Sequence, residues 1–328
     1  MRLKSKTNMS VPNGYIHSNP SVTQDVFGGI SSVTERKLLQ PDRNWEPHLP
    51  VFEPQNYKFF DSMSCVTFSA LNCLEILGKR KFNLIENFSD RFTAKMSGTT
   101  RVGNTFYNVS NSIKTRDGLL RQSEYPNDVN DWEEFHKTVS EAMIAKAKEI
   151  FSEYNIPSEY VSTDTGTLWD VLQYGPVQVS GFAWESPVNG IFRRTNVTAN
   201  HAFTLIGGEY GKFWKIFDSY EWLKGDSGIK KLAWDYRFWA GLCYNLDTLK
   251  PIEYMKFAEN TLLQLVDAPG GFYLFAAGKL YKDDLSKLLA SFMVRTKGIL
   301  PGHVGTMTRN DLEGVKTYNL KGEEVAPF

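Results

Sequence analysis

Three residues, in the order Cys65, His201 and Asp218, have the types needed for nucleophilic acyl transfer. A cysteine thiolate is a strong nucleophile, and a helix N-terminus or an adjacent imidazolium favours its formation at neutral pH. A histidine can accept and return the proton that the reaction moves, and a carboxylate can orient the imidazole. Cys65 and His201 are 136 residues apart, and His201 and Asp218 are 17 apart. Their joint occurrence makes acyl transfer the leading hypothesis.

Each of the three residues also has a purely structural interpretation. A cysteine beside Val66 and Phe68 can be a small core residue. A histidine that opens an apolar strand can be a hydrogen-bonded structural group, and an aspartate at a strand end commonly forms a turn. Cys73, in the same apolar run as Cys65, lacks the other features and is predicted to pack in the core. Only the combination of all three residues favours catalysis over packing.

An apolar helix is predicted to begin near Cys65 and to place it in the first turn. The stripe that indicates this helix consists of Val66, Ala70, Leu74 and Leu77. Ser62 or Ser64 can cap the start, and Gly78 stands where a helix end favours glycine. The thiol of Cys65 would therefore lie where the helix dipole favours a negative charge.

Two strand-like runs, 201–208 and 212–220, are joined by glycine-rich residues and predict an antiparallel hairpin. His201 opens the first run and Asp218 lies near the end of the second. Because the ends of paired antiparallel strands meet, we expect the two side chains to come within reach of each other.

The remaining segments predict helices first and strands afterwards, which is typical of an α+β domain. Residues 130–154 carry an amphipathic pattern with Asn130 and Glu133 as a possible capping box, and predict one long helix. A shorter helix is expected at 168–174, followed by a strand region from Val177. Beyond Pro251 the sequence predicts a strand pair within 270–281 and a helix at 283–292. We therefore expect an N-terminal extension or pro-segment-like arm (1–42), a catalytic domain (43–250) and a small C-terminal accessory α/β module (251–328).

The residues around the three candidates resemble the motifs of papain-like cysteine peptidases. The stretch SMSCVTFSALN at 62–72 is similar to the family's nucleophile motif, with Phe68-Ser69 matching its Phe-Ser pair. NHAFTLIGGEYG resembles the histidine strand, and KIFDSYEW resembles the strand that bears the family's Asn-Ser-Trp. The separations of the three residues also fit this family. The resemblance covers about residues 43–248.

This resemblance implies a two-lobed fold, with a helical lobe around the nucleophile helix and an antiparallel sheet lobe, and a Cys-His-Asp triad that cleaves protein or peptide substrates. Asp218 replaces the family's usual asparagine. The usual oxyanion-hole glutamine, six residues before the cysteine, is replaced by Phe59, so Gln55 is the candidate donor across a lengthened loop. The resemblance further suggests substrate-binding and shielding residues at Gly103, Asn104, Asn200, Ala202, Tyr220 and Trp222.

Composition limits the other functions. Lys+Arg and Asp+Glu both total 37, so no overall charge attracts nucleic acid. No apolar run is long enough for a membrane span or a signal-peptide core. The five histidines are not spaced as metal ligands, and no nucleotide-binding motif occurs, so neither a metal nor a cofactor is expected. Three cysteines argue against a disulfide framework and for a reducing compartment.

Two other functions remain open at this point. The same thiol chemistry could act on a peptidoglycan cross-link or a glutamine side chain, as in wall hydrolases or transglutaminase-like enzymes. Alternatively, the chain could be a non-catalytic binding or structural protein on a papain-like scaffold, because Phe59 stands at the oxyanion position. The lack of family disulfides and the appended module resemble bacterial or bacteriophage members, for which a cytoplasmic or virion-associated location and a virion or host protein partner are expected.

Overall fold

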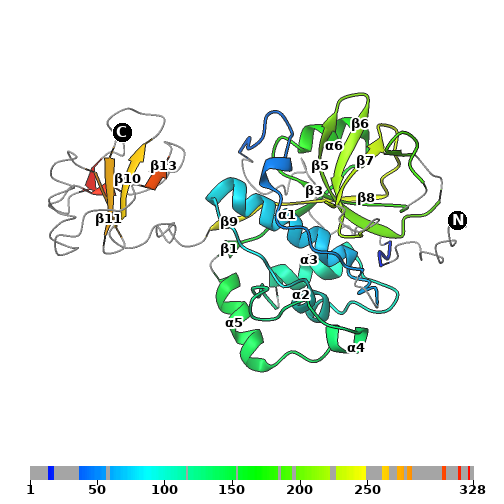
Figure 1. The fold of residues 1–328 in the computed structure, drawn as a ribbon, viewed down its shortest axis with the longest axis horizontal. Coiled ribbons are helices and arrows are strands. Elements are labelled where there is room, and N and C mark those ends of the chain that lie inside the picture. The colour runs from blue at the N-terminus through cyan, green and yellow to red at the C-terminus, as the bar shows by residue number, and fades with distance from the viewer. Residues whose placement is uncertain are drawn as a thin grey trace, which may run out of the picture. The chain divides into compact units, whose positions relative to one another are not determined.

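The computed structural model describes residues 14–17, 37–56, 60–115, 117–152, 154–183, 186–193, 197–221 and 227–248, and beyond these only short strands between 261 and 325. The chain forms two compact units, residues 1–247 and 248–328. The first unit carries all the candidate site residues that the structure describes, and Figure 1 shows α1 to α5 on one side and the main sheet with α6 on the other. Among the described residues, no helix has the length and apolar character needed to cross a bilayer.

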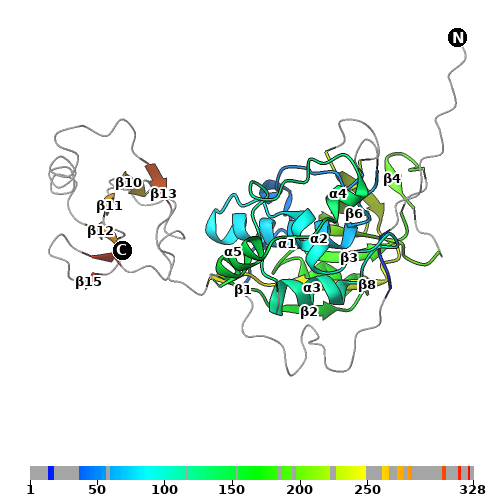
Figure 2. The ribbon, with the colours of Figure 1, turned by 90° about the horizontal axis from the view of Figure 1, so that it is seen from below.

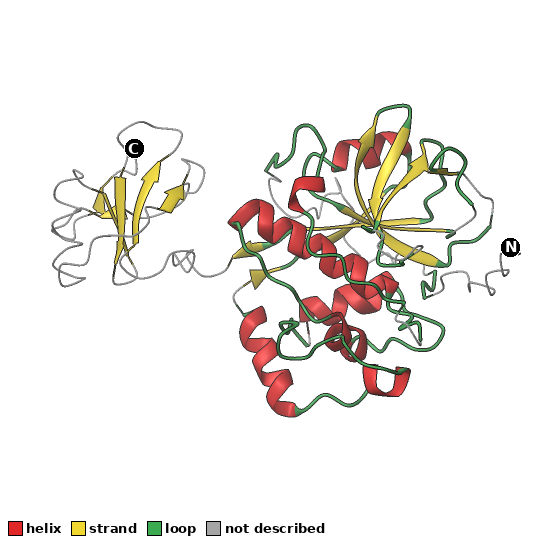
Figure 3. Ribbon diagram, in the orientation of Figure 1, coloured by secondary structure: helices red, strands yellow, loops and turns green. Residues whose placement is uncertain are grey.

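One buried helix, α1, runs through the centre of the first unit (Figures 1 and 2). It spans Cys65–Phe82, and most of its residues are buried on all sides, which accounts for its nearly continuous apolar sequence. The other helices are α2 (Asp90–Met96), α3 (Phe106–Thr115), α4 (Trp132–Phe135), α5 (Glu141–Phe151), α6 (Thr165–Val171) and the short 3-10 helix η1 (Glu46–His48). Together α1 to α5 make up the helical lobe (Figure 3).

The sheet lobe is a seven-stranded sheet with the order β2-β8-β3-β5-β6-β7-β4. Its strands are β2 (Ser158–Val161), β3 (Val177–Gly181), β4 (Ile191–Phe192), β5 (His201–Glu209), β6 (Phe213–Phe217), β7 (Ile229–Ala233) and β8 (Ala240–Tyr244). All neighbours are antiparallel except β4 and β7. A separate two-stranded sheet pairs β1 (Tyr154–Asn155) with β9 (Asp247–Thr248). The predicted hairpin is confirmed as β5 and β6.

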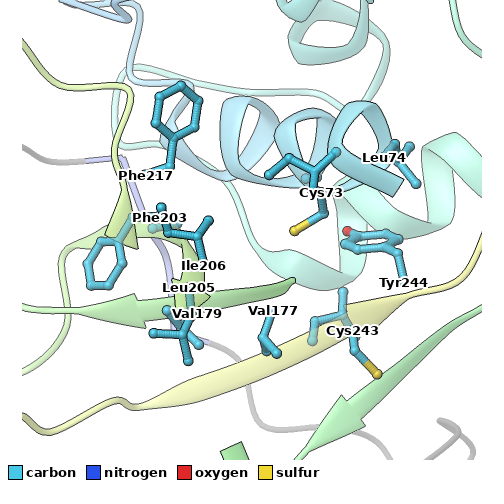
Figure 4. Packing of buried hydrophobic residues seen from close by; sticks show 14 of the residues in the cluster. Cys73, Leu74, Val177, Val179, Phe203, Leu205, Ile206, Phe217, Cys243 and Tyr244 are labelled. Carbon is cyan, nitrogen blue, oxygen red and sulfur yellow. The ribbon is translucent and has the colours of Figure 1, made fainter. Parts of the chain in front are cut away.

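The core lies between α1 and one face of this sheet. In Figure 4, Cys73 of α1 faces a layer of branched and aromatic side chains from β3, β5 and β8. These three strands are buried along most of their length, and β-branched and aromatic residues pack well in such strands. Cys73 lies in this core, as the sequence predicts, and burial raises the pKa of its thiol.

Two local predictions are wrong. Residues 130–154 do not form one helix but the separate helices α4 and α5, each with its own cap: Asp131 accepts from the Glu134 amide, and Ser140 accepts from the Met143 amide. An N-cap side chain fixes the position at which a helix begins, so Ser140 starts a second helix within a pattern that apolar periodicity alone would read as one. Gly78 is likewise not a C-cap, because α1 continues for another turn and ends at Asn83, which adopts the left-handed conformation with φ 52°.

The second unit contains a six-stranded mixed sheet with the order β13-β10-β11-β12-β14-β15. These strands are β10 (Thr261–Leu265), β11 (Phe272–Ala276), β12 (Lys279–Lys282), β13 (Gly305–Met307), β14 (Thr317–Tyr318) and β15 (Glu324–Val325). The predicted strand pair within 270–281 is confirmed as antiparallel β11 and β12. The predicted helix at 283–292 lies outside the described residues.

Candidate active site

Cys65 is the first residue of α1, and its side chain is fully buried. Ser64 occupies the N-cap position, but its hydroxyl donates to the carbonyl of Ser62 at 2.9 Å instead of capping the helix. The amide hydrogens of the first turn are therefore not taken up by a Ser64 side-chain cap, and the positive end of the helix dipole lies at the thiol. This is the position in which a helix favours a thiolate.

Side chains of the sheet hold the first turn of α1 in place. Gln178 on β3 donates to the carbonyl of Val66 at 2.7 Å and to the hydroxyl of Ser69 at 2.9 Å. Thr204 on β5 donates to the carbonyl of Ser69 at 3.1 Å, and the Ser69 hydroxyl bonds the carbonyl of Cys65 at 2.7 Å. Because all these groups are buried, the loss of any one of these hydrogen bonds would cost free energy. The position of Cys65 is thus fixed relative to β3 and β5.

His201 and Asp218 are brought together as the hairpin predicts. His201 opens β5, Asp218 follows the last residue of β6, and the imidazole Nε2 lies 2.6 Å from the Asp218 Oδ1. Both side chains are fully buried. The amide of Tyr220 also donates to Oδ1 at 3.2 Å, which holds the carboxylate in one orientation. Because Nε2 is occupied in this way, Nδ1 is the ring nitrogen that remains to face the thiol.

Opposing effects set the charge of this pair. Burial lowers the pKa of the His201 imidazole, but Asp218 and Cys65 act through charge and hydrogen bonding and raise it to about 10. Burial raises the pKa of the Asp218 carboxyl, but Lys230 and His201 outweigh burial and lower it to about 2. At neutral pH the imidazole is therefore charged and paired with a carboxylate. Cys65 is close enough to contribute to this balance, so the structure brings all three predicted residues into one site.

Sequence reasoning missed Lys230, which is also part of this cluster. Its side chain is almost fully buried, and its Nζ lies 3.0 Å from the Asp218 Oδ2 and 2.8 Å from the carbonyl of Tyr220. A sequence signal exists, since Lys230 alternates with buried Leu232 on β7 and so shares its face, whereas Lys231 is exposed. Lysines are almost never buried unless they are paired.

Gln55 is buried beside the start of α1, separated from Cys65 by a lengthened loop. Its amide donates to the Asp61 Oδ1 at 3.0 Å, and its Oε1 accepts from the Ser219 hydroxyl at 3.0 Å. A backbone bridge between Asn56 and Asp61 closes the loop, whose residues 57–59, including Phe59, lie outside the described residues. Asp61 also accepts from the amide of Met63, which has φ 56°. Burial is the main effect that raises the pKa of the Asp61 carboxyl.

A short stretch of the N-terminal arm, residues 14–17, lies against Cys65. A side chain added to Gly14 would stand 3.1 Å from the Cys65 sulfur. The amide of Tyr15 donates to the Asn200 carbonyl at 3.1 Å, and Ile16 donates to the Asn104 carbonyl at 2.8 Å. The backbone amide of Asn104 in turn donates to the Gly14 carbonyl at 2.9 Å. Two of the predicted substrate-binding residues therefore hold a segment of the chain itself.

The remaining predicted site residues have different positions. Gly103 has φ 98° and packs so closely on Gly14 that a side chain there would clash with its carbonyl. Ala202 is buried within β5, opposite Ser180 of β3. The Tyr220 ring meets the His201 imidazole edge-on, with 6.2 Å between ring centres. Trp222 lies outside the described residues.

Within the part of the chain that the structure describes, no group of three or more histidine, cysteine, aspartate or glutamate side chains is arranged to hold a metal ion. The three cysteines are free thiols, all of them buried.

No protein-family model matches the sequence. No curated protein matches it either. Solved structures do match. The chain is similar to xylellain, a cysteine protease from Xylella fastidiosa, with 16% identity over 76% of this chain and 100% of that chain and a TM-score of 0.54. It is also similar to the cysteine protease and lectin-like domains of Cwp84, a surface layer associated protein of Clostridium difficile, with 13% identity over 66% of this chain and 54% of that chain and a TM-score of 0.51.

These likenesses show the fold. The first unit has the two-lobed α+β fold of papain-like cysteine proteases, as the sequence predicts. At these identities the fold alone is shared, because one scaffold can carry different sites and activities.

Proposed function

We propose that the protein is a cysteine peptidase in which Cys65, His201 and Asp218 form the catalytic triad. The observation that carries this proposal is the buried Asp218–His201 hydrogen bond of 2.6 Å, located beside a cysteine at the start of a buried helix. Structural roles for the three residues would not require a charged imidazole in the core. Burying a charged imidazole costs free energy unless opposite charges compensate it, and strongly perturbed groups of this kind are concentrated at functional sites.

In the proposed reaction the Cys65 sulfur attacks a peptide carbonyl carbon, and the carbonyl oxygen takes the negative charge. Collapse of this intermediate breaks the C–N bond while His201 gives its Nδ1 proton to the leaving amine. The thioester that remains is hydrolysed by a water molecule, which gives up its proton to His201 as it attacks. Asp218 keeps the imidazole in the orientation and tautomer that both steps need.

The oxyanion is stabilised, in this proposal, by the Cys65 backbone N–H and by the side-chain amide of Gln55. Asp61 uses one amide hydrogen of Gln55 and Ser219 binds its carbonyl oxygen, so the orientation of the amide is fixed. A second amide hydrogen stays available to an oxyanion. A donor of this kind contributes roughly 3 kcal/mol to transition-state stabilisation.

We further propose that residues 43–250 form the catalytic domain, that residues 1–42 act as a pro-segment-like arm, and that residues 251–328 form an accessory module. Support for the arm comes from the backbone of Gly14, which lies against the Cys65 sulfur. The Gly14 carbonyl oxygen accepts the amide of Asn104 and so does not point to the oxyanion donors. In this proposal the arm covers the thiol in a non-productive pose, and a substrate displaces it before cleavage. Three free thiols are consistent with a reducing compartment.

Replacement of Cys65 tests the proposed function. The full-length wild type, Cys65→Ala and Cys73→Ala proteins are each incubated with a complex peptide mixture, and new termini are identified by mass spectrometry. We expect cleavage by the wild type and by Cys73→Ala, whose altered thiol lies in the core, and none by Cys65→Ala. A parallel incubation with cell-wall fragments separates a peptidase from a wall hydrolase. Equal cleavage by Cys65→Ala, or a wild type that cleaves only cell-wall fragments, would refute the proposal.

A further inference from the structure

Lys230 forms a fourth, buried member of the charge cluster at the site. Its Nζ lies 3.0 Å from the Asp218 Oδ2, on the opposite side of the carboxylate from His201, which binds Oδ1. The same Nζ donates to the carbonyl of Tyr220 at 2.8 Å. The exposed fractions of the Lys230 and Asp218 side chains are only 4% and 0%. Little water is therefore available to screen either charge.

Backbone register places Lys230 in this position. β7 pairs antiparallel with β6, where Lys230 is opposite Ile216, and the Asp218 amide donates to the Gly228 carbonyl at 2.8 Å. Gly228 has φ 76°, and a side chain there would stand 2.8 Å from the Asp218 carbonyl oxygen and 2.6 Å from the Phe52 ring. The turn before β7 is therefore held closely against Asp218, and Lys230 points to it from the next strand.

A buried aspartate brings a negative charge into the core, which a neutral amide at the same position would not do. An uncompensated carboxylate would be costly to bury and would hold the imidazolium proton too strongly. A proton held too strongly is not readily given to a leaving amine, since efficient acid catalysis needs a matched acid. With Lys230 present, the ionised forms of Cys65, His201, Asp218 and Lys230 alternate in sign and sum to zero.

We propose that Lys230 is a positioning residue for the triad: it fixes the Asp218 carboxylate and offsets part of its charge, so that Asp218 holds the His201 proton less strongly than an uncompensated carboxylate would. This inference rests on the proposed function for its catalytic meaning. Among the described residues, other groups that face the cluster are Cys65 from α1, Asp61 from the preceding loop, whose carboxyl is influenced by both His201 and Asp218, and the Tyr220 ring. Within this described set, Lys230 is the cation that binds the Asp218 carboxylate on the side away from His201.

The titration of His201 tests the inference without requiring turnover. In full-length protein with ¹³C-labelled histidine, imidazole NMR signals are followed against pH for the wild type, Lys230→Met, Lys230→Arg and Lys231→Met. We expect Lys230→Met to raise the His201 midpoint by at least about half a pH unit, because removing one nearby cation favours the charged imidazole. Lys230→Arg should restore the midpoint, and Lys231→Met, an exposed neighbour on the same strand, should leave it unchanged. An unchanged midpoint in Lys230→Met would overturn the inference.

A second pair of variants covers the case in which Lys230→Met does not fold. Asp218→Asn leaves Lys230 as a buried cation without its carboxylate, whereas Asp218→Asn/Lys230→Met removes both charges. We expect the double variant to unfold at higher urea than Asp218→Asn and to titrate His201 at higher pH. The opposite order in either measurement would count against a charge-balancing role.

Turnover separates this inference from the proposed function. The Tyr15 side chain of the arm is buried against Phe106, so Tyr15→Ala removes a contact that holds the arm. In the Tyr15→Ala background, Lys230→Met should lower kcat more than tenfold with little change in KM, and Lys230→Arg should recover part of the lost kcat. A shifted His201 midpoint in a protein that cleaves no peptide would keep the Lys230 inference and reject the peptidase. Normal kcat in Lys230→Met would reject the positioning role and keep the peptidase.

Discussion

At the scale of single residues, the site combines a thiol at a helix start with a charged imidazole inside the core. The imidazole carries its charge because Asp218, Cys65 and the hydrogen bonds of both outweigh the effect of burial on its pKa. The carboxyl of Asp218 stays ionised because Lys230 and His201 outweigh burial in the same way. Ionisation of the pair therefore persists over a wide range of pH.

The pH dependence of turnover follows from these shifts. The pKa of His201 is raised from 6.5 to about 10, so its favourable interactions are fully present below pH 6.5 and are lost as the pH rises through about 10. We expect kcat/KM to show its alkaline limb between about pH 9 and 10 rather than near 6.5. His136→Gln is the control and should leave the alkaline limb unchanged. Burial lowers the pKa of His136 to about 4, and its Nε2 bonds the Ser62 carbonyl, outside the His201–Asp218 pair. A limb near 6.5 would contradict the ion pair.

At acid pH the relevant group is Asp218, whose pKa is shifted in the opposite direction to that of His201. The pKa of Asp218 is lowered from 3.8 to about 2, so the stability it contributes is present above pH 3.8 and is lost as the pH falls through about 2. Between roughly pH 4 and 9 the charge state of His201 and Asp218 is constant, and no loss of their pairing is expected there.

The proximity of Cys65, His201 and Asp218 could be predicted from the sequence because each residue has a local signature: a helix start, a strand start and a strand end. Lys230 has only its alternation with Leu232 as a signal, and Asp61 has none. Their roles depend on which strand or loop lies beside Asp218 and Gln55, and that adjacency is set by the pairing of β6 with β7 and by the closed loop 56–61. From the sequence alone, a lysine in a strand is predicted to face solvent, because lysines are almost never buried without a partner.

At the scale of elements, the first turn of α1 is held by polar bonds inside an otherwise apolar interface. Gln178 makes three of them, since its amide donates to Val66 and Ser69 and its Oε1 accepts from the Tyr244 hydroxyl at 3.0 Å. The fully buried side chain has no water to replace these partners. Such a network specifies one position of the helix on the sheet.

Loss of the Gln178 amide should therefore lower the free energy of unfolding by more than the small size of the group suggests. Gln178→Leu keeps the volume but removes hydrogen bonds to three buried residues and takes away the acceptor of the Tyr244 hydroxyl. We expect the free energy of unfolding to fall by at least about 2 kcal/mol. Urea denaturation measures this change. Gln173→Leu, at a less buried position after α6, is the control and should change stability by less than about 0.5 kcal/mol. Equal effects of the two variants would show that the polar bonds do not hold α1.

Helix and strand positions near the site were predictable from periodicity, but helix ends were not. The pattern at 130–154 has the right apolar spacing for one helix, yet Asp131 and Ser140 each cap a separate piece. In α1, Lys79, Arg80 and Lys81 favour continuation past Gly78 because cations suit a helix C-terminus. Caps and terminal charges act locally and override the pattern of apolar residues.

At the scale of the whole molecule, the chain contains both a candidate enzyme and a segment that fills its site. Tyr15 of the arm is buried, and its ring packs on Phe106 of α3 with 5.1 Å between centres. Burial raises the pKa of the Tyr15 hydroxyl to about 12, while the Ser180 hydroxyl opposes this shift. The side chain thus serves as an anchor for residues whose backbone lies on Cys65. The sequence did not predict this contact, because residues 1–42 show no periodic pattern.

Removal of the anchor should expose the thiol. Burial of an aromatic side chain contributes about 1.5–3 kcal/mol, so Tyr15→Ala should increase the rate of Cys65 alkylation by iodoacetamide at least about tenfold. The rate is measured on the full-length chain by mass spectrometry. Tyr107→Ala, an exposed position on α3, should leave the rate unchanged. If Tyr15→Ala reacts no faster than the wild type, the arm does not protect the site.

The proposed mechanism requires a thioester between Cys65 and the substrate, and trapping of that acyl-enzyme tests it most directly. Full-length protein is mixed with an N-acyl amino acid p-nitrophenyl ester, quenched in acid within seconds, digested and examined by mass spectrometry. We predict one acyl adduct, labile to hydroxylamine, on the peptide that contains Cys65, with no adduct in Cys65→Ala and slow formation in His201→Ala. An adduct on Cys73 or Cys243, or one that persists in Cys65→Ala, would contradict the mechanism.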